Sequence, residues 1–102
     1  MSYPEHKRKF NQGAVAWNAW RRDNPDVKPN LQGVTLSGDL RAFHFSEIDF
    51  GTCLLFGADI SVADVRHSKF HLATMRGADF TRAEMSHANL ERAELNLHLK
   101  MG

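Results

Sequence analysis

Histidine, serine and carboxylate side chains are the residues of this chain that could form a metal site or a hydrolytic site. The chain has six histidines and one cysteine, Cys53. His67 and His87 lie twenty residues apart, and His44 precedes them. No ligand set with Cys or carboxylate has the fixed spacing that a zinc site needs, and no nucleophile motif surrounds any serine. We therefore expect no catalytic residue, no metal and no cofactor, and we interpret the histidines as surface residues.

The carboxylates are spaced more regularly than the histidines. Asp39, Asp59 and Asp79 recur at intervals of twenty residues, as do Asp64 and Glu84, and Glu47 lies near the start of both series. A row of negative charge can steer a cationic surface toward a protein. Whether these side chains form such a row depends on the backbone that positions them, and the apolar residues indicate what that backbone is.

Apolar residues recur at every fifth position over more than half of the chain. The twelve positions are Leu40, Phe45, Phe50, Leu55, Ile60, Val65, Phe70, Met75, Phe80, Met85, Leu90 and Leu95. Two residues before each lies a second series, which is uniformly small from Cys53 onward: Cys53, Ala58, Ala63, Ser68, Ala73, Ala78, Ala83, Ala88 and Ala93. The positions between are mostly polar, so each unit offers one large and one small residue to an interior.

A period of five excludes the two common elements. Five residues of an α-helix turn the chain by about 500°, so twelve such residues would scatter around the helix without forming a stripe. In a straight strand an odd period would place successive residues on opposite faces. A backbone that turns a corner every five residues, by contrast, directs all of the large and small residues inward.

Several units resemble the pentapeptide-repeat consensus of a small residue, Asp or Asn, Leu or Phe, a polar residue and any residue. The clearest are residues 58–62, 63–67, 78–82, 83–87, 88–92 and 93–97. The head resembles that of many bacterial members in its segments Trp17-Asn18-Ala19-Trp20-Arg21, Asn24-Pro25 and Pro29-Asn30-Leu31. The resemblance implies an all-β solenoid: a right-handed quadrilateral β-helix with four repeats per coil and about three coils, and an N-terminal α-helical cap. We place the capping helix and linker in residues 1–30 and the β-helix in residues 31–102, as one folding unit.

Four repeats per coil would place residues twenty apart in one column, with about 4.8 Å between coils. The interior columns are then Leu40/Ile60/Phe80, Phe45/Val65/Met85, Phe50/Phe70/Leu90 and Leu55/Met75/Leu95. The step from Leu36 to Leu40 is only four residues, so we expect a distorted first coil. Phe43 and Ile48 are large where later repeats are small, and they should widen that coil.

One amphipathic helix is predicted near residues 5–23. Its apolar face would be formed by Phe10, Ala14, Val15, Trp17 and Trp20. Pro25 ends it, because the residue before a proline disfavours the α region. A solenoid end exposes apolar side chains and unpaired backbone and therefore needs a cover. We interpret Trp17 and Trp20 as the structural cap over Phe43 and Ile48, with a ligand-binding tryptophan pair as the alternative.

The C-terminal end has no comparable cap in the sequence. Leu95, Leu97 and Leu99 alternate there, followed by Lys100, Met101 and Gly102. An exposed apolar last coil favours pairing with a second copy through a two-fold end-to-end contact, as the resemblance also implies. We therefore expect a homodimer through the C-terminal coil.

The resemblance gives the carboxylates a specific meaning, because some pentapeptide-repeat proteins present acidic columns that mimic duplex DNA and inhibit type II topoisomerases. Such a face would consist of Asp39, Glu47, Asp59, Asp64, Asp79 and Glu84. Arg41, Arg66 and Arg82 lie on the same two faces and would dilute its field. The alternative is that Asp simply belongs to the repeat, where its side chain caps the backbone of the turn.

Two further groups of residues have two interpretations each. Leu54 and Phe56 occupy positions that should face solvent. They form either an apolar contact patch for a protein partner or a contact with the helix or its linker. The basic segment of residues 7–9, together with Arg21 and Arg22, either touches phosphates or is a solvated helix face.

Length and charge limit the number of domains, the class of partner and the compartment. A chain of 102 residues suits a single domain. Residues 1–30 hold six Lys and Arg against three Asp and Glu, whereas residues 31–102 hold seven against nine. The head is basic and the body mildly acidic, and neither half is extreme enough to require nucleic acid. No apolar run suits a membrane span or a secretory signal, and one cysteine excludes an internal disulfide. We expect a cytoplasmic protein without a membrane partner.

These features favour a non-catalytic protein–protein interaction module with an unknown protein partner. Flat solenoid walls without deep pockets also argue against an enzyme. The alternative is a DNA-mimicking inhibitor or protector of a DNA-processing enzyme, such as a topoisomerase, a gyrase or a phage-defence nuclease.

Overall fold

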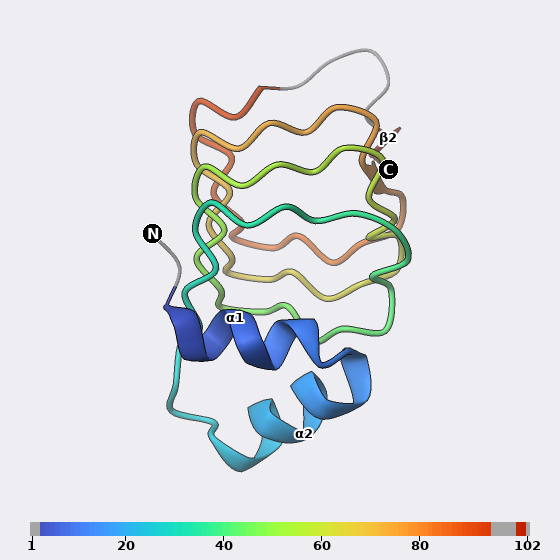
Figure 1. Cartoon of the computed structure of the whole chain (residues 1–102). Helices are drawn as coiled ribbons and strands as arrows, with labels where there is room; N and C mark the ends of the chain where they lie inside the picture. The colour runs from blue at the N-terminus through green and yellow to red at the C-terminus, as the bar shows by residue number, and fades with distance from the viewer. Residues whose placement is uncertain (1–2, 95–99, 102) are drawn as a thin grey trace.

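The five-residue period becomes a stack of coils that rises from a helical head (Figure 1). The computed structural model describes residues 3–94 and 100–101. Parallel bridges join residues twenty apart, among them Asp39 with Asp59, His44 with Asp64, Asp49 with Lys69 and Leu54 with Thr74. Each residue therefore lies over the residue four repeats earlier, which is the column arrangement expected from the sequence.

Regular strand is short, because each side of a coil offers few residues before the next corner. The strands named among the described residues are β1 (Asp79–Phe80) and β2 (Lys100–Met101), which pair in parallel. The other contacts between coils are isolated parallel bridges. The expected all-β solenoid is therefore built from bridged turns with little regular strand.

The first coil is one residue shorter than those above it. Asn30 bridges Asp49 and Thr35 bridges Leu54, which are separations of 19 residues, whereas Asp39 bridges Asp59 at 20. The change falls between Thr35 and Asp39, where the sequence takes a four-residue step. The predicted irregularity of the first coil is confirmed.

Corners of the stack are tight turns that place one residue in the left-handed region. At one corner the N–H of Ala63 donates to the C=O of Ile60 at 3.1 Å, and Val62 between them has φ 54°. Thr52 and Leu72 occupy the same repeat position, with φ of 56° and 58°. L-residues pay roughly 1–2 kcal/mol for this conformation, and a β-branched side chain there is an outlier.

Replacing Val62 with asparagine should raise the free energy of unfolding by about 1 kcal/mol. Val62 is exposed, so little packing is lost, and asparagine adopts the left-handed conformation more readily. Urea unfolding would measure the change. Val62→Thr is the matched control, because threonine stays β-branched and should give no gain. Equal stabilities of the Asn and Thr variants would contradict the interpretation.

The interior columns are buried as predicted. Phe50 and Phe70 stack with ring centroids 5.0 Å apart and planes 12° from parallel. Ala58, Ala73 and Ala78 of the small series are fully buried, so the interior has no space for larger residues there. In the last described coil Met85 and Leu90 are only half-buried. Leu95 lies outside the described residues.

The head consists of two helices, and the prediction of one helix is wrong. Helix α1 spans Pro4–Asn11 and helix α2 spans Ala14–Asp23. The break lies at Gly13, whose φ of 99° is not helical. The predicted apolar face is wrong for Val15, which is 87% exposed. Helix α2 ends before Pro25, as expected.

Aromatic rings join the head to the first coil, in an arrangement that differs from the expected one. Phe10 covers Phe43, with ring centroids 5.2 Å apart. Trp17 is fully buried and meets Phe45 at 6.4 Å. Trp20 is half-buried and packs on Trp17 at 5.2 Å. The sequence placed Phe10 on the apolar face of the head but assigned the cap to the tryptophans, because it did not predict the bend at Gly13 that turns α1 back over the coil.

Candidate interaction surface

Helix α2 supplies hydrogen bonds that a preceding coil would otherwise make. The Asn18 side chain accepts from the His44 N–H at 2.9 Å and donates to the Ala42 C=O at 2.8 Å. The Trp17 indole N–H donates to the His44 C=O at 2.8 Å. Arg21 donates to the carbonyls of His44 and Ser46 at 2.9 and 2.8 Å. Arg21 is therefore bound to backbone rather than presented to phosphates.

Hydrogen bonds also join helix α1 and the residue before it to the start of the first coil. The Asn30 N–H donates to Nδ1 of His6 at 3.0 Å, and the Asn30 C=O accepts from the Tyr3 N–H at 3.2 Å. His6 is buried between the rings of Tyr3 and Trp20, each at 5.1 Å. Burial lowers the pKa of His6, and the charge of Glu5 opposes this shift. An Nδ1 that accepts a hydrogen bond must be unprotonated.

Acid should weaken the attachment of α1. Because the pKa of His6 is lower in the folded protein than in the unfolded chain, its contribution to stability is complete above the unfolded pKa. That contribution is lost as the pH falls through the folded pKa. We expect the stability difference between the native protein and His6→Phe to shrink between pH 7 and pH 5 in urea unfolding. A difference independent of pH would contradict this.

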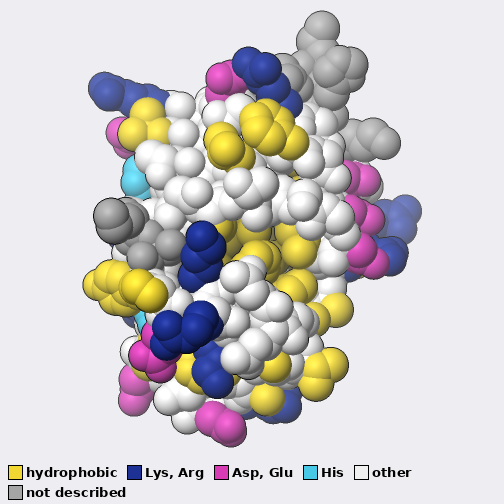
Figure 2. Space-filling model, viewed as in Figure 1, with side chains coloured by type: hydrophobic (Ala, Val, Ile, Leu, Met, Phe, Trp, Pro, Cys, Tyr) yellow, Lys and Arg dark blue, Asp and Glu magenta, His cyan; other side chains and the backbone are white. Residues whose placement is uncertain are grey.

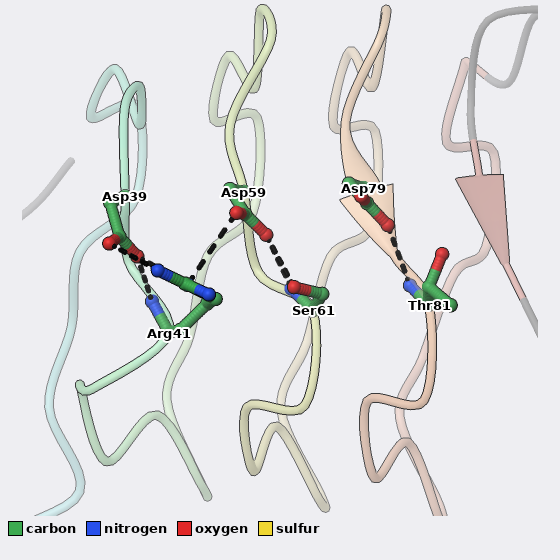
Figure 3. Close-up of polar contacts among 6 residues, drawn as sticks. All are labelled: Asp39, Arg41, Asp59, Ser61, Asp79 and Thr81. Atoms are coloured by element: carbon green, nitrogen blue, oxygen red, sulfur yellow. Dashed lines mark hydrogen bonds and ion pairs between the residues drawn. The ribbon is translucent and has the colours of Figure 1, made fainter.

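The predicted acidic column lies along one side of the stack (Figure 3). Asp39 bridges Asp59, which bridges Asp79. One oxygen of each carboxylate accepts the backbone N–H two residues later, at 3.2 Å from Arg41, 3.1 Å from Ser61 and 2.9 Å from Thr81. The alternative interpretation, in which Asp caps its own turn, is therefore confirmed for this column.

Two arginines neutralise much of the acidic surface. Arg41 binds Asp39 through two hydrogen bonds of 2.9 Å and lies 3.6 Å from Asp59. Hydrogen bonds from the Arg41 guanidinium lower the pKa of Asp39 to about 2. On the next side Arg66 binds Asp64 in the same way and lies 3.4 Å from Glu84. Each column therefore has one arginine that contacts two of its carboxylates.

Glu47 belongs to neither bridged acidic column, although it lines one hollow together with Asp64. It occupies a corner with φ 59° and lines two hollows of about 360 Å³ each between the head and the first coils. Lys28, His67 and Lys69 line one of them, and Arg21, Arg22 and His44 line the other. Both hollows are polar and of mixed charge.

Leu54 lies in the bridge ladder of one side of the stack, and Phe56 lies in the turn that follows it two residues later. Leu54 is half-buried between Thr35 and Thr74 in the bridge ladder, whereas Phe56 is 47% exposed. Phe56 has no ring contact within the described part of the chain and does not belong to the core or to the residues packed on it.

Sequence reasoning missed Leu72, which is 51% exposed at the corner beside Thr74. The signal that could have found it is the one used for Phe56: an apolar residue at a repeat position that is elsewhere polar or glycine. Figure 2 shows hydrophobic atoms near Lys and Arg on the upper part of the stack. Arg76, two residues after Thr74, forms an ion pair of 2.8 Å with Glu94.

The remaining candidates are placed as follows. His67 and His87 stack at 4.8 Å, and His44 lies on the adjoining side against Asp64. No group of three or more metal-ligating side chains occurs in the part of the chain that the structure describes. Leu95, Leu97 and Leu99 lie outside the described residues. Neither described helix is long and apolar enough to cross a membrane.

Comparison with known proteins identifies the five-residue repeat. Residues 63–96 match the family model of pentapeptide repeats in eight copies. The crystal structure of Rfr23, a pentapeptide-repeat protein from the cyanobacterium Cyanothece 51142, matches with a TM-score of 0.60 and 20% identity. The match covers 74% of this chain and 52% of that one. It supports a right-handed β-helix.

A second solved structure is HetL from the cyanobacterium Nostoc sp. strain PCC 7120, a pentapeptide-repeat protein involved in heterocyst differentiation regulation. It matches with a TM-score of 0.28 and 24% identity, over 67% of this chain and 47% of that one. The matches thus span about half the length of either protein. None of the curated proteins matches the chain.

Proposed function

Because this chain is a pentapeptide-repeat protein, we propose that it is a non-catalytic module that binds another protein through one side of its β-helix. The proposed contact is the side that carries Leu54 and Phe56. The observation that supports it most directly is the exposure of Phe56. All seven phenylalanines lie among the described residues, and the other six are buried or half-buried while Phe56 is exposed.

An exposed aromatic ring on a flat wall suits a protein contact. Burying such a side chain contributes roughly 1.5–3 kcal/mol, and aromatic residues of this kind often dominate the binding energy of an interface. The half-buried Leu54 beside it and Leu72 at the corner extend the apolar area. The adjacent Arg76–Glu94 pair would lie at a polar rim.

A capture experiment from the source cell tests this function. The native chain, Phe56→Ser and Leu54→Ser would be immobilised in parallel, with Val15→Ser as the matched control on the head. We expect one partner to be retained by the native chain and by Val15→Ser, including at high salt, because an apolar contact is poorly screened. Both coil variants should lose it. Equal retention by Phe56→Ser, with unchanged thermal unfolding, would contradict the proposal.

Mimicry of DNA is a weaker candidate. A mimic needs an unbroken row of negative charge, but Arg41 and Arg66 bind carboxylates in both columns. We therefore expect no inhibition of gyrase supercoiling by the native chain. Inhibition that disappears on Asp64→Asn and Glu84→Gln, but not on Phe56→Ser, would favour mimicry instead.

A further inference from the structure

One part of the backbone edge facing the head is unpaired. In the second coil the Leu54 N–H donates to the Val34 C=O at 3.0 Å, and its C=O accepts from the Leu36 N–H at 2.7 Å. Thr35 is the equivalent residue of the first coil, with no coil beneath it. Its N–H and C=O have no hydrogen-bond partner among the described residues, and Thr35 is exposed.

The head fills two of the four equivalent positions on this edge. Asn30 is satisfied by His6 and Tyr3, and His44 by Asn18, Trp17 and Arg21. The head thus replaces a coil on two sides of the stack. It leaves open the sides of Thr35 and Asp39, whose backbone N–H and C=O groups have no partner among the described residues. The Thr35 side is also the side of Leu54 and Phe56.

The surroundings of this edge indicate what would pair with it. Figure 2 shows a hollow between the lowest run of the coil and helix α1, with hydrophobic atoms at its floor and Lys and Arg atoms along one side of it. Helix α1 contributes the cations Lys7, Arg8 and Lys9. Arg41, Arg66 and Arg76 of the coils form ion pairs. Within the described ranges, no ion pair involves the three cations of helix α1.

We propose that an extended, acidic segment of a partner protein adds to the stack at Thr35 as an extra strand. Its backbone would give and accept the hydrogen bonds that Thr35 lacks, which is how open sheet edges capture peptides. Alternate side chains of a strand point to opposite faces, so an apolar residue fills the hollow and acidic residues face α1. The inference rests on the proposed function, because it uses the same side and the same class of partner.

A peptide selected on the intact chain tests this inference. A displayed library of random linear peptides would be panned on the native protein, and the most enriched peptide would be synthesised with a fluorophore. We expect an acidic peptide that binds Thr35→Pro about tenfold more weakly than the native chain, because proline removes the N–H and obstructs the edge. Thr35→Val is the matched control, since it keeps the N–H, and should bind as the native chain does.

Hydrogen exchange gives a measurement that needs no variant. The Thr35 amide of the free protein should exchange far faster than that of Leu54, and it should become protected when the peptide binds. Equal affinities of the Pro and Val variants, no added protection at Thr35, or no enriched peptide would each overturn the inference. Binding that depends on Phe56 but not on Thr35 would overturn it while leaving the proposed function intact.

Discussion

Replacing Trp17 with alanine should lower the free energy of unfolding by about 3–5 kcal/mol, the usual range for removing a buried tryptophan. Trp17 is fully buried, and its ring packs against Phe10, Trp20 and Phe45. The variant also loses the indole hydrogen bond to the His44 C=O. A domain of this size has a total stability of only about 5–15 kcal/mol. Urea unfolding followed by far-ultraviolet dichroism would measure the loss.

Two control variants separate this effect from general damage to the head. Val15→Ala removes an exposed side chain from the same helix and should change the stability by less than about 0.5 kcal/mol. Trp20→Ala removes a half-buried ring and should have an intermediate effect. If Trp17→Ala were as stable as Val15→Ala, the head would not be docked on the first coil in solution, and the proposal of one folding unit would fail.

The sequence predicted the coil better than the head, for a physical reason. Each inward residue of the coil repeats the environment of its neighbours. The period of five, together with the four repeats per coil that the family resemblance implies, therefore places Phe50 beneath Phe70. The head has no repeat. Gly13 was expected only to weaken a helix, but it adopts a φ of 99° and reverses the chain. That reversal brings Phe10 onto Phe43 and turns Val15 to solvent.

Surface features of the coil were also easier to predict from the sequence than those that depend on the head. The exposure of Phe56 followed from its position in the repeat. The hydrogen bonds of Asn18 and Arg21 to the coil edge join residues 23–26 positions apart and depend on how α2 docks. No local pattern encodes that orientation. The open edge at Thr35 could not be predicted either, because it is defined by which backbone groups the head leaves unpaired.

Replacing Phe70 with alanine should also lower the free energy of unfolding by about 3–5 kcal/mol. Phe70 lies in the middle of the stack, fully buried. It is parallel to Phe50 at 5.0 Å and edge-on to Phe80 at 5.7 Å. In a solenoid each coil is stabilised mainly by its neighbours, so a cavity here weakens the contacts both within and between coils. Calorimetry or urea unfolding would measure the effect.

Leu72→Ala is the matched control, because Leu72 lies two residues away on the same coil but is 51% exposed. It should change the stability by less than about 0.5 kcal/mol. A double-mutant cycle of Phe50→Leu and Phe70→Leu should then give a coupling of about 0.5–1.5 kcal/mol, the usual value for a ring pair in contact. Additive effects of the two substitutions would mean that these rings do not lie over one another, and the column arrangement of the whole β-helix would be wrong.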